Sequence, residues 1–174
     1  DDVVLPGQTH AAFLRSPHAH ARIASIDTTA ARAMPGVVAI FTGRDIADSK
    51  IGGLPCGWLI HSRDGSPMKE PPHPIIAADK VLHVGDQVAL VVAETALQAK
   101  DAAEAIVVDY DVLPAVVEPA KAPGAATALH EAAPDNVCYT WGHGDEAAVD
   151  AAFAKAAHVT RLGFANNRLI PNAM

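Results

Sequence analysis

Two histidines, His18 and His20, have the spacing most suggestive of metal chemistry in this sequence. On a β-strand, residues two apart face the same side, so both imidazoles could bind one Zn²⁺. A zinc site needs a third ligand and usually a fourth, and the sequence offers neither at a recognisable spacing. The other seven histidines are scattered along the chain. We therefore favour an ordinary polar strand face at His18 and His20, with a metal site as the alternative.

Cys56, in the segment Gly-Gly-Leu-Pro-Cys-Gly-Trp, could act as a nucleophile on a flexible loop. A catalytic thiol needs a base within hydrogen-bonding reach. The nearest histidine in the sequence is His61, and nothing in the sequence places it beside the thiol. We interpret Cys56 as a loop residue without a catalytic role.

Asp109 and Asp111 are two residues apart on an expected strand and could pair as a general acid and a general base. The alternating residues Val108, Tyr110 and Val112 are expected to point inward. Both carboxylates then lie on the solvated face, where isolated aspartates are common.

The Gly85-Asp86 pair resembles a phosphate-binding turn, but no glycine-rich phosphate motif surrounds it. A phosphate site of this kind would need the N-terminus of a helix directly after the pair, but a strand is expected there. A hairpin turn is the simpler interpretation.

The composition limits the possible partners and compartments. The chain has 174 residues, 50% of them hydrophobic, and a formal net charge of −7 with 13 Lys plus Arg. A chain this apolar is expected to fold, and one so poor in basic residues is not expected to bind nucleic acid. Two cysteines, Cys56 and Cys138, form no secreted disulfide framework. Because neither a membrane span nor a basic signal segment is evident, we expect a cytoplasmic protein with reduced thiols.

Apolar periodicity predicts alternating strands and helices in the first part of the chain. Residues 10–26 resemble one strand interrupted at Pro17, and Asp27 is expected to cap a helix over residues 28–34 that Pro35-Gly36 ends. Residues 37–41 are expected to form a short buried strand. Residues 50–74 are rich in Pro and Gly and form a long loop, which is typical of a functional, interface or mobile segment.

After this loop, Thr95 and Gln98 form a capping box that opens a helix to about residue 105. Its expected packing face contains Leu97, Ala102 or Asp101, and Ala105 or Ile106. A strand over residues 106–112 is expected to follow.

The C-terminal part is expected to be a separate extension. Residues 121–133 form an Ala-, Pro- and Gly-rich connection, which places a domain boundary between residues 1–133 and 134–174. Asp145 is expected to cap a helix, and a strand over residues 158–165 is expected to follow. We expect the chain to self-associate through these elements. The apolar stripe of the expected helix consists of Val149, Ala152, Phe153 and Ala156.

Four segments, in this order, carry a resemblance to a known family. They are Leu14-Arg-Ser-Pro-His-Ala-His-Ala-Arg-Ile23, Met34-Pro-Gly-Val-Val-Ala-Ile-Phe-Thr-Gly43, Val84-Gly-Asp-Gln-Val-Ala-Leu-Val-Val-Ala-Glu94 and Val108-Asp-Tyr-Asp-Val-Leu-Pro-Ala-Val-Val117. The set resembles the alpha/beta-hammerhead domain of the xanthine dehydrogenase and aldehyde oxidase family, which includes the large subunit of carbon monoxide dehydrogenase. One departure is Asp86, where family members often have Gln or Glu.

The resemblance implies an α+β hammerhead domain with a mixed sheet and two main packed helices. A short C-terminal helix–strand extension, residues 134–174, would begin a truncated molybdopterin-binding domain. The whole enzyme would be a molybdenum hydroxylase, which inserts oxygen from water into a C–H bond or, in one branch, oxidises carbon monoxide. Electrons would pass through [2Fe–2S] clusters to FAD on partner domains or subunits.

In the family, the pterin-binding residues and the catalytic glutamate lie beyond the position of Met174. We therefore nominate no catalytic, cofactor-binding or metal-binding residue, and expect this fragment to be inactive alone and to hold no cofactor. Its expected role is a scaffold and subunit interface. The expected partners are the rest of the large subunit, the iron–sulfur and FAD subunits or domains, and a second copy in a homo-oligomer.

Two functions from other classes remain open. One is a free-standing protein-binding module whose loop over residues 50–74 grips a partner. The other is a metalloprotein that uses His18 and His20. The length of the gene beyond Met174 discriminates the enzyme subunit from the module, and metal content tests the second alternative.

Overall fold

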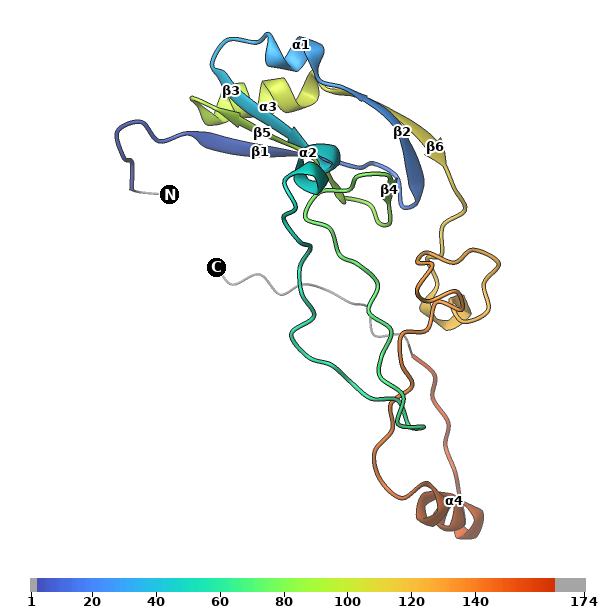
Figure 1. Ribbon diagram of the computed structural model, residues 1–174. Coiled ribbons are helices and arrows are strands. Elements are labelled where there is room, and N and C mark those ends of the chain that lie inside the picture. The colour runs from blue at the N-terminus through green and yellow to red at the C-terminus, as the bar shows by residue number, and fades with distance from the viewer. Residues whose placement is uncertain (1–2, 165–174) are drawn as a thin grey trace. The chain divides into compact units, whose positions relative to one another are not determined.

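The computed structural model describes residues 3–164, and the chain divides into two compact units, Asp1–Thr140 and Trp141–Met174. The first unit contains two three-stranded sheets (Figure 1). One, sheet A, has the order β1 (His10–Arg15), β5 (Gln87–Ala93) and β3 (Val37–Thr42). The other, sheet B, has the order β4 (Lys80–Val81), β2 (Ala21–Asp27) and β6 (Val107–Val112).

The α+β hammerhead class is confirmed, with one difference in the sheet. Instead of a single mixed sheet, the strands form two sheets in which each pairing is antiparallel. The split arises because residues 10–26 do not form one strand. They bend after Arg15, so that β1 joins sheet A and β2 joins sheet B.

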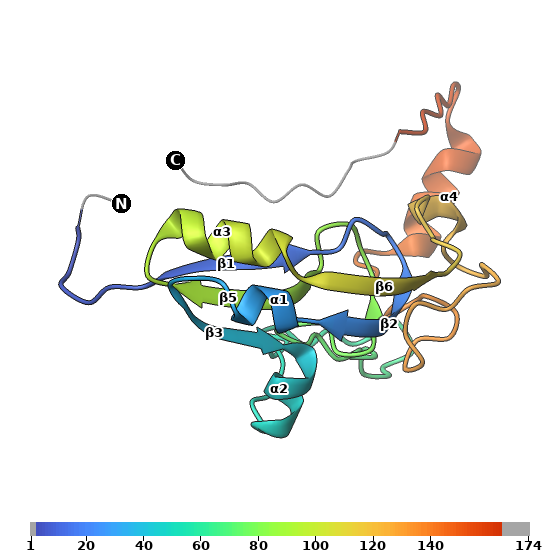
Figure 2. The same ribbon diagram turned by 90° about the horizontal axis from the view of Figure 1, so that it is seen from above.

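The main core lies between sheet A and helix α3 (Ala96–Glu104), which runs along β1 and β5 (Figure 2). The helix buries Ala99, Ala102 and Ala103, whose small side chains allow close approach to the sheet. The expected packing face was partly wrong, because Leu97 is 68% exposed. Helix α1 (Thr29–Arg32) contributes the buried Ala31 to the same core.

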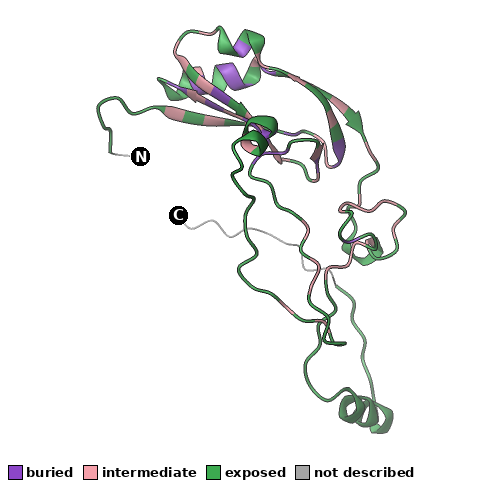
Figure 3. Cartoon of the chain, viewed as in Figure 1, coloured by how far each residue is buried: buried purple, intermediate pink, exposed green. Residues whose placement is uncertain are grey.

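A second, smaller core joins the two sheets. It consists of Ala21, Ala77, Val81 and Val88, which come from β2, β4, β5 and the segment that precedes β4. Like the main core, it is built from short or β-branched side chains. Figure 3 shows the buried residues of the two cores as purple bands on the strands and on α1 and α3.

The helix ends follow the capping pattern with small shifts. Thr95 Oγ1 accepts a hydrogen bond from the backbone N–H of Gln98, which confirms the predicted start of α3. Helix α1 is shorter than predicted and has Thr28 at its cap position. Asp27, predicted as the cap, remains in β2 and accepts a hydrogen bond from Thr29 N–H through Oδ1.

Helix α2 (Gly43–Asp48) was not predicted. A capping box starts it: Asp45 accepts hydrogen bonds from the backbone and the hydroxyl of Thr42, and Thr42 is the cap residue. The Thr42 hydrogen bonds hold the pKa of Asp45 below its usual value.

The second unit contains helix α4 (Glu146–Lys155), and the predicted cap is confirmed because Asp145 Oδ1 accepts from Ala148 N–H. No residue of α4 is buried. The strand predicted over residues 158–165 is absent from residues 158–164, and Ala165 lies outside the described residues. Without a neighbouring strand to pair with, an isolated segment of this length gains no ladder hydrogen bonds.

Candidate functional site

His18 and His20 do not share a strand face, contrary to the geometry that a metal site would need. Both lie in the bend between β1 and β2. The ring of His18 packs edge-on against Tyr110 of β6, with 4.9 Å between ring centroids. Burial is the main cause that raises the pKa of Tyr110.

His20 is buried and fixes the ends of two strands. Its Nδ1 lies 2.8 Å from the carbonyl oxygen of Pro114, and its own carbonyl accepts from Leu113 N–H at 2.9 Å. Because a carbonyl only accepts, Nδ1 must carry the proton. Nε2 is then the remaining possible ligand atom, and it is enclosed with no hydrogen-bond partner among the described residues. This arrangement suits a structural histidine.

No group of three or more His, Cys, Asp or Glu side chains within residues 3–164 could hold a metal ion. Cys56 is exposed, and its thiol lies 3.2 Å from the carbonyl oxygen of Trp58. Asp109 and Asp111 are exposed, as predicted, and Asp109 accepts a hydrogen bond from Ser25. Their neighbour Val112 was expected to point inward but is exposed.

The Gly85-Asp86 turn joins two sheets and is not the hairpin turn that the sequence suggested. The strands it connects, β4 and β5, belong to different sheets. Gly85 has a φ of +90°, a conformation that suits glycine, and its N–H donates to the carbonyl of Ser16. In return, Ser16 N–H donates to the carbonyl of Asp86 at 2.8 Å, and Arg15 Nη1 donates to the carbonyl of Gly85 at 2.8 Å.

The segments over residues 14–23 and 84–94, two of the four that carry the family resemblance, therefore meet at one corner. The Asp86 carboxylate accepts a hydrogen bond from Leu82 N–H, which closes the turn from the inside. The corner positions the strands of the two sheets.

The long loop, residues 50–74, folds back on itself and is called the arm below. Its two limbs are joined by backbone hydrogen bonds from Leu54 to His73 and from Met68 to Ile60, at 2.8 and 2.9 Å. Its base is closed where Gly43 and the backbone of Ala77 meet without space for a side chain. An ordered arm of this length fits a binding or interface element better than a mobile linker.

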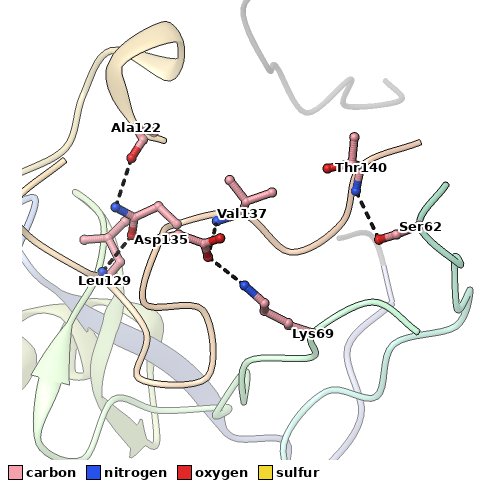
Figure 4. A network of polar contacts seen from close by, with 8 residues as sticks. Ser62, Lys69, Ala122, Leu129, Asp135, Val137 and Thr140 are labelled. Carbon is pink, nitrogen blue, oxygen red and sulfur yellow. Dashed lines mark hydrogen bonds and ion pairs between the residues drawn. The ribbon is translucent and has the colours of Figure 1, made fainter. Parts of the chain in front are cut away.

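A later segment, residues 135–140, clamps the arm (Figure 4). Lys69 N–H donates to the carbonyl of Cys138 at 2.9 Å, and Thr140 N–H donates to the hydroxyl of Ser62 at 3.2 Å. Lys69 also forms an ion pair of 2.7 Å with Asp135. This contact with Lys69 is the main reason that the pKa of Asp135 lies below its usual value.

Asn136 organises the connection that precedes this clamp. Its Oδ1 accepts from Leu129 N–H, and its Nδ2 donates to the carbonyls of Thr127 and Ala122, at 3.0, 2.9 and 3.2 Å. Its backbone has a φ of +57°, which asparagine tolerates better than most residues. The connection over residues 121–133 is therefore folded around one side chain, and the first compact unit continues to Thr140.

The surface of the first limb of the arm is apolar. Trp58 is the most exposed of its large side chains, at 79%. Single exposed apolar residues are common on protein surfaces, but several large ones within nine positions form a patch. The exposed set is Ile51, Leu54, Trp58 and Leu59.

The comparisons with known proteins agree with this fold. The family model "Aldehyde oxidase and xanthine dehydrogenase, a/b hammerhead domain" matches residues 1–114, and the chain belongs to this family. It is 37% identical to the carbon monoxide dehydrogenase large chain of Afipia carboxidovorans, over 100% of this chain and 22% of the relative. It is 34% identical to the xanthine dehydrogenase molybdenum-binding subunit of Escherichia coli O157:H7, over 68% of this chain and 15% of the relative.

Among solved structures, reconstituted CO dehydrogenase from Oligotropha carboxidovorans matches with a TM-score of 0.72 and 35% identity. That match covers 90% of this chain and 20% of the solved chain. The chain thus spans about a fifth of the length of its carbon monoxide dehydrogenase relatives.

Proposed function

We propose that this chain is the hammerhead portion of the large subunit of a molybdenum hydroxylase, where it serves as a scaffold and subunit interface. The observation that carries the proposal is the alignment of the whole chain, at 37% identity, with about a fifth of a carbon monoxide dehydrogenase large chain. The proposed compartment is the cytoplasm. Within the described residues, no helix is long and apolar enough to cross a membrane.

The described residues offer no ligand group for a metal ion such as molybdenum. Their histidines, cysteines and acids form no ligand group, and the one buried imidazole nitrogen without a partner, His20 Nε2, is enclosed. We therefore place the molybdopterin in the rest of the large subunit, and the [2Fe–2S] clusters and FAD on partner domains or subunits. When bound, the molybdenum centre would supply the oxidation chemistry, and this chain would supply the surfaces around it.

The arm is the proposed subunit-interface element. Its apolar limb presents Trp58, a residue type that often dominates binding energy at interfaces, on a backbone held by the clamp. A preorganised loop loses less conformational entropy on binding than a flexible one.

Two measurements on the complete gene product test the proposal. Elemental analysis is expected to find molybdenum near one atom per complete large subunit and none in the 174-residue chain. A gene that stops soon after Met174 would favour the free-standing binding module instead, because the arm could still bind a partner. Stoichiometric molybdenum in the 174-residue chain would contradict the placement of the cofactor.

A matched pair of variants tests the role of the arm. In the complete large subunit, Trp58→Ser is expected to weaken binding to the iron–sulfur or FAD subunits by about tenfold or more. Leu97→Ser, on the exposed side of α3, is the control and should leave the affinity unchanged. Equal affinities for both variants and the unmodified subunit would show that the arm is not at an interface.

A further inference from the structure

Within the described residues, the face of sheet A opposite α3 is apolar and open, except at the end of β5, where Val88 is buried in the second core. Helix α3 lies on one face of sheet A (Figure 1), the face that contains Ala89 and Val91, and alternate residues of a strand point to the opposite face. There, Phe13 of β1 and Phe41 of β3 both pair with Leu90 of β5, which gives an apolar row across the three strands. Phe13 and Phe41 are 42% and 40% exposed. A parallel row consists of Ala11, Val92 and Ala39.

The composition of the strands indicates that this face is covered in the native protein. Strand β5 reads Gln-Val-Ala-Leu-Val-Val-Ala, an almost continuous apolar run, which is typical of strands buried on both faces. Sheet B provides an internal comparison. Its strands carry polar residues on the solvent side, such as Arg22 in β2 and Asp109 and Asp111 in β6, as expected for an antiparallel sheet with one wet face.

The open face is too small to hold a separate protein by itself. The face is three strands wide, at about 4.8 Å per strand, and about five residues long, at about 3.3 Å per residue, so its area is roughly 200 Å². A stable interface between separate proteins buries about 800 Å² on each partner. A tethered segment needs much less area, because its effective concentration reaches the millimolar range.

We propose that this face, defined by Ala11, Phe13, Ala39, Phe41, Leu90 and Val92, is covered by apolar side chains from the part of the large-subunit polypeptide that lies outside this chain. The inference rests on the proposed function, since the matched region is 22% of the length of the carbon monoxide dehydrogenase relative. Arg15 marks the rim, because its guanidinium lies 5.6 Å from the ring centre of Phe13.

Cysteine labelling in the complete large subunit tests the inference. Ala11→Cys adds a thiol to the open face with a minimal change of volume, and Ala24→Cys adds one at an exposed position of β2 in sheet B. Each is read by peptide mass spectrometry, which separates the new thiol from Cys56 and Cys138. In the complete subunit, the thiol at position 11 is expected to react at least tenfold more slowly than in the 174-residue chain, while the thiol at position 24 reacts equally in both. Phe41→Cys should repeat the result for position 11.

The other outcomes each overturn the inference. Equal labelling at position 11 in both forms means an open face, and equal slowing at both positions means a cover that is not specific to sheet A. Protection that appears only on adding the partner subunits assigns the face to a separate subunit. Protection that grows with the concentration of the 174-residue chain assigns it to a second copy. A short gene would instead show that the proposed function is wrong, because no complete large subunit would then exist for the comparison, so the two failures are distinguishable.

Discussion

Gly43→Ala should be one of the most damaging single-methyl additions to this chain. Gly43 begins α2 and is buried where the end of β3 meets the segment that precedes β4. A Cβ added there would lie 2.5 Å from the carbonyl carbon of Ala77 and 2.5 Å from Cα of Ala78, and closer still to the carbonyl oxygen of Ala77. All three are backbone atoms, which cannot rotate away as the end of a side chain can.

The cost follows from the distance that the backbone must move. Ordinary contact begins near 3.4 Å, so the two segments must separate by about 1 Å at the base of the arm. Overpacking of this kind typically costs 1–3 kcal/mol, and we expect about 3 kcal/mol here because the clash is with backbone. For a domain of this size, the midpoint of thermal unfolding should then fall by about 6–12 °C.

Thermal unfolding followed by far-ultraviolet circular dichroism measures the effect. Gly57→Ala is the matched control, because an added Cβ there has nothing within 4 Å and its midpoint should change little. A Gly43→Ala protein as stable as the Gly57→Ala protein would refute the proposed backbone contact between residues 43 and 77.

Three further predictions concern other parts of the chain. Burial, with smaller effects from Lys80 and His73, lowers the pKa of His130 below its usual 6.5. As the pH falls below about 6.5, the unfolded chain therefore protonates this histidine before the folded chain does, which lowers the free energy of unfolding. His130→Gln should therefore lose less stability between pH 7.5 and 5.5 than the unmodified chain, as judged by urea midpoints. Limited proteolysis should cut after Thr140 before it cuts within residues 81–108, because the first unit contains the two cores; the reverse order would contradict this. Because Val149 and Phe153 of α4 are 51% and 58% exposed, the chain should self-associate in light scattering, and a chain ending at Thr140 should not. Equal association of the two chains would exclude α4 as the contact.

The sequence correctly predicted those features that depend on residues close together in the chain, such as helix caps. The capping residues Thr95 and Asp145 start α3 and α4 as expected, because a cap depends on neighbours within four residues. The alternation in β6 placed Asp109 in solvent correctly. The resemblance to the hammerhead domain, which required several segments in order, gave the correct family.

The errors concern contacts between distant residues. The apparent strand over residues 10–26 contains a bend because Arg15 and Ser16 form hydrogen bonds with the Gly85-Asp86 turn. Arg15 and Gly85 are seventy residues apart in the sequence. The strand predicted over residues 158–165 had suitable residue types, but no partner strand is present for residues 158–164.

The clamp on the arm could not be predicted for the same reason. Its backbone hydrogen bonds, such as that from Lys69 to Cys138, depend on the path of the chain and leave no periodic pattern in the sequence. Asn136 offered a weak signal, since an asparagine in a Pro- and Gly-rich connection often adopts a left-handed conformation. That signal could have indicated an ordered turn, but not its three hydrogen-bond partners.

Because the base of the arm is closed, the length of the arm can change without disturbing the fold of the two sheets. With the ends fixed at Gly43 and Ala77, an insertion at the tip of the arm, near Gly65, leaves the backbone hydrogen bonds that join the two limbs in place and mainly adds to the entropy of a loop that is already closed. Doubling the length of a flexible loop costs about 0.6 kcal/mol, which the rest of the domain could tolerate. The arm is thus a natural place to graft a foreign recognition sequence, or for evolution to change partners without redesigning the two sheets.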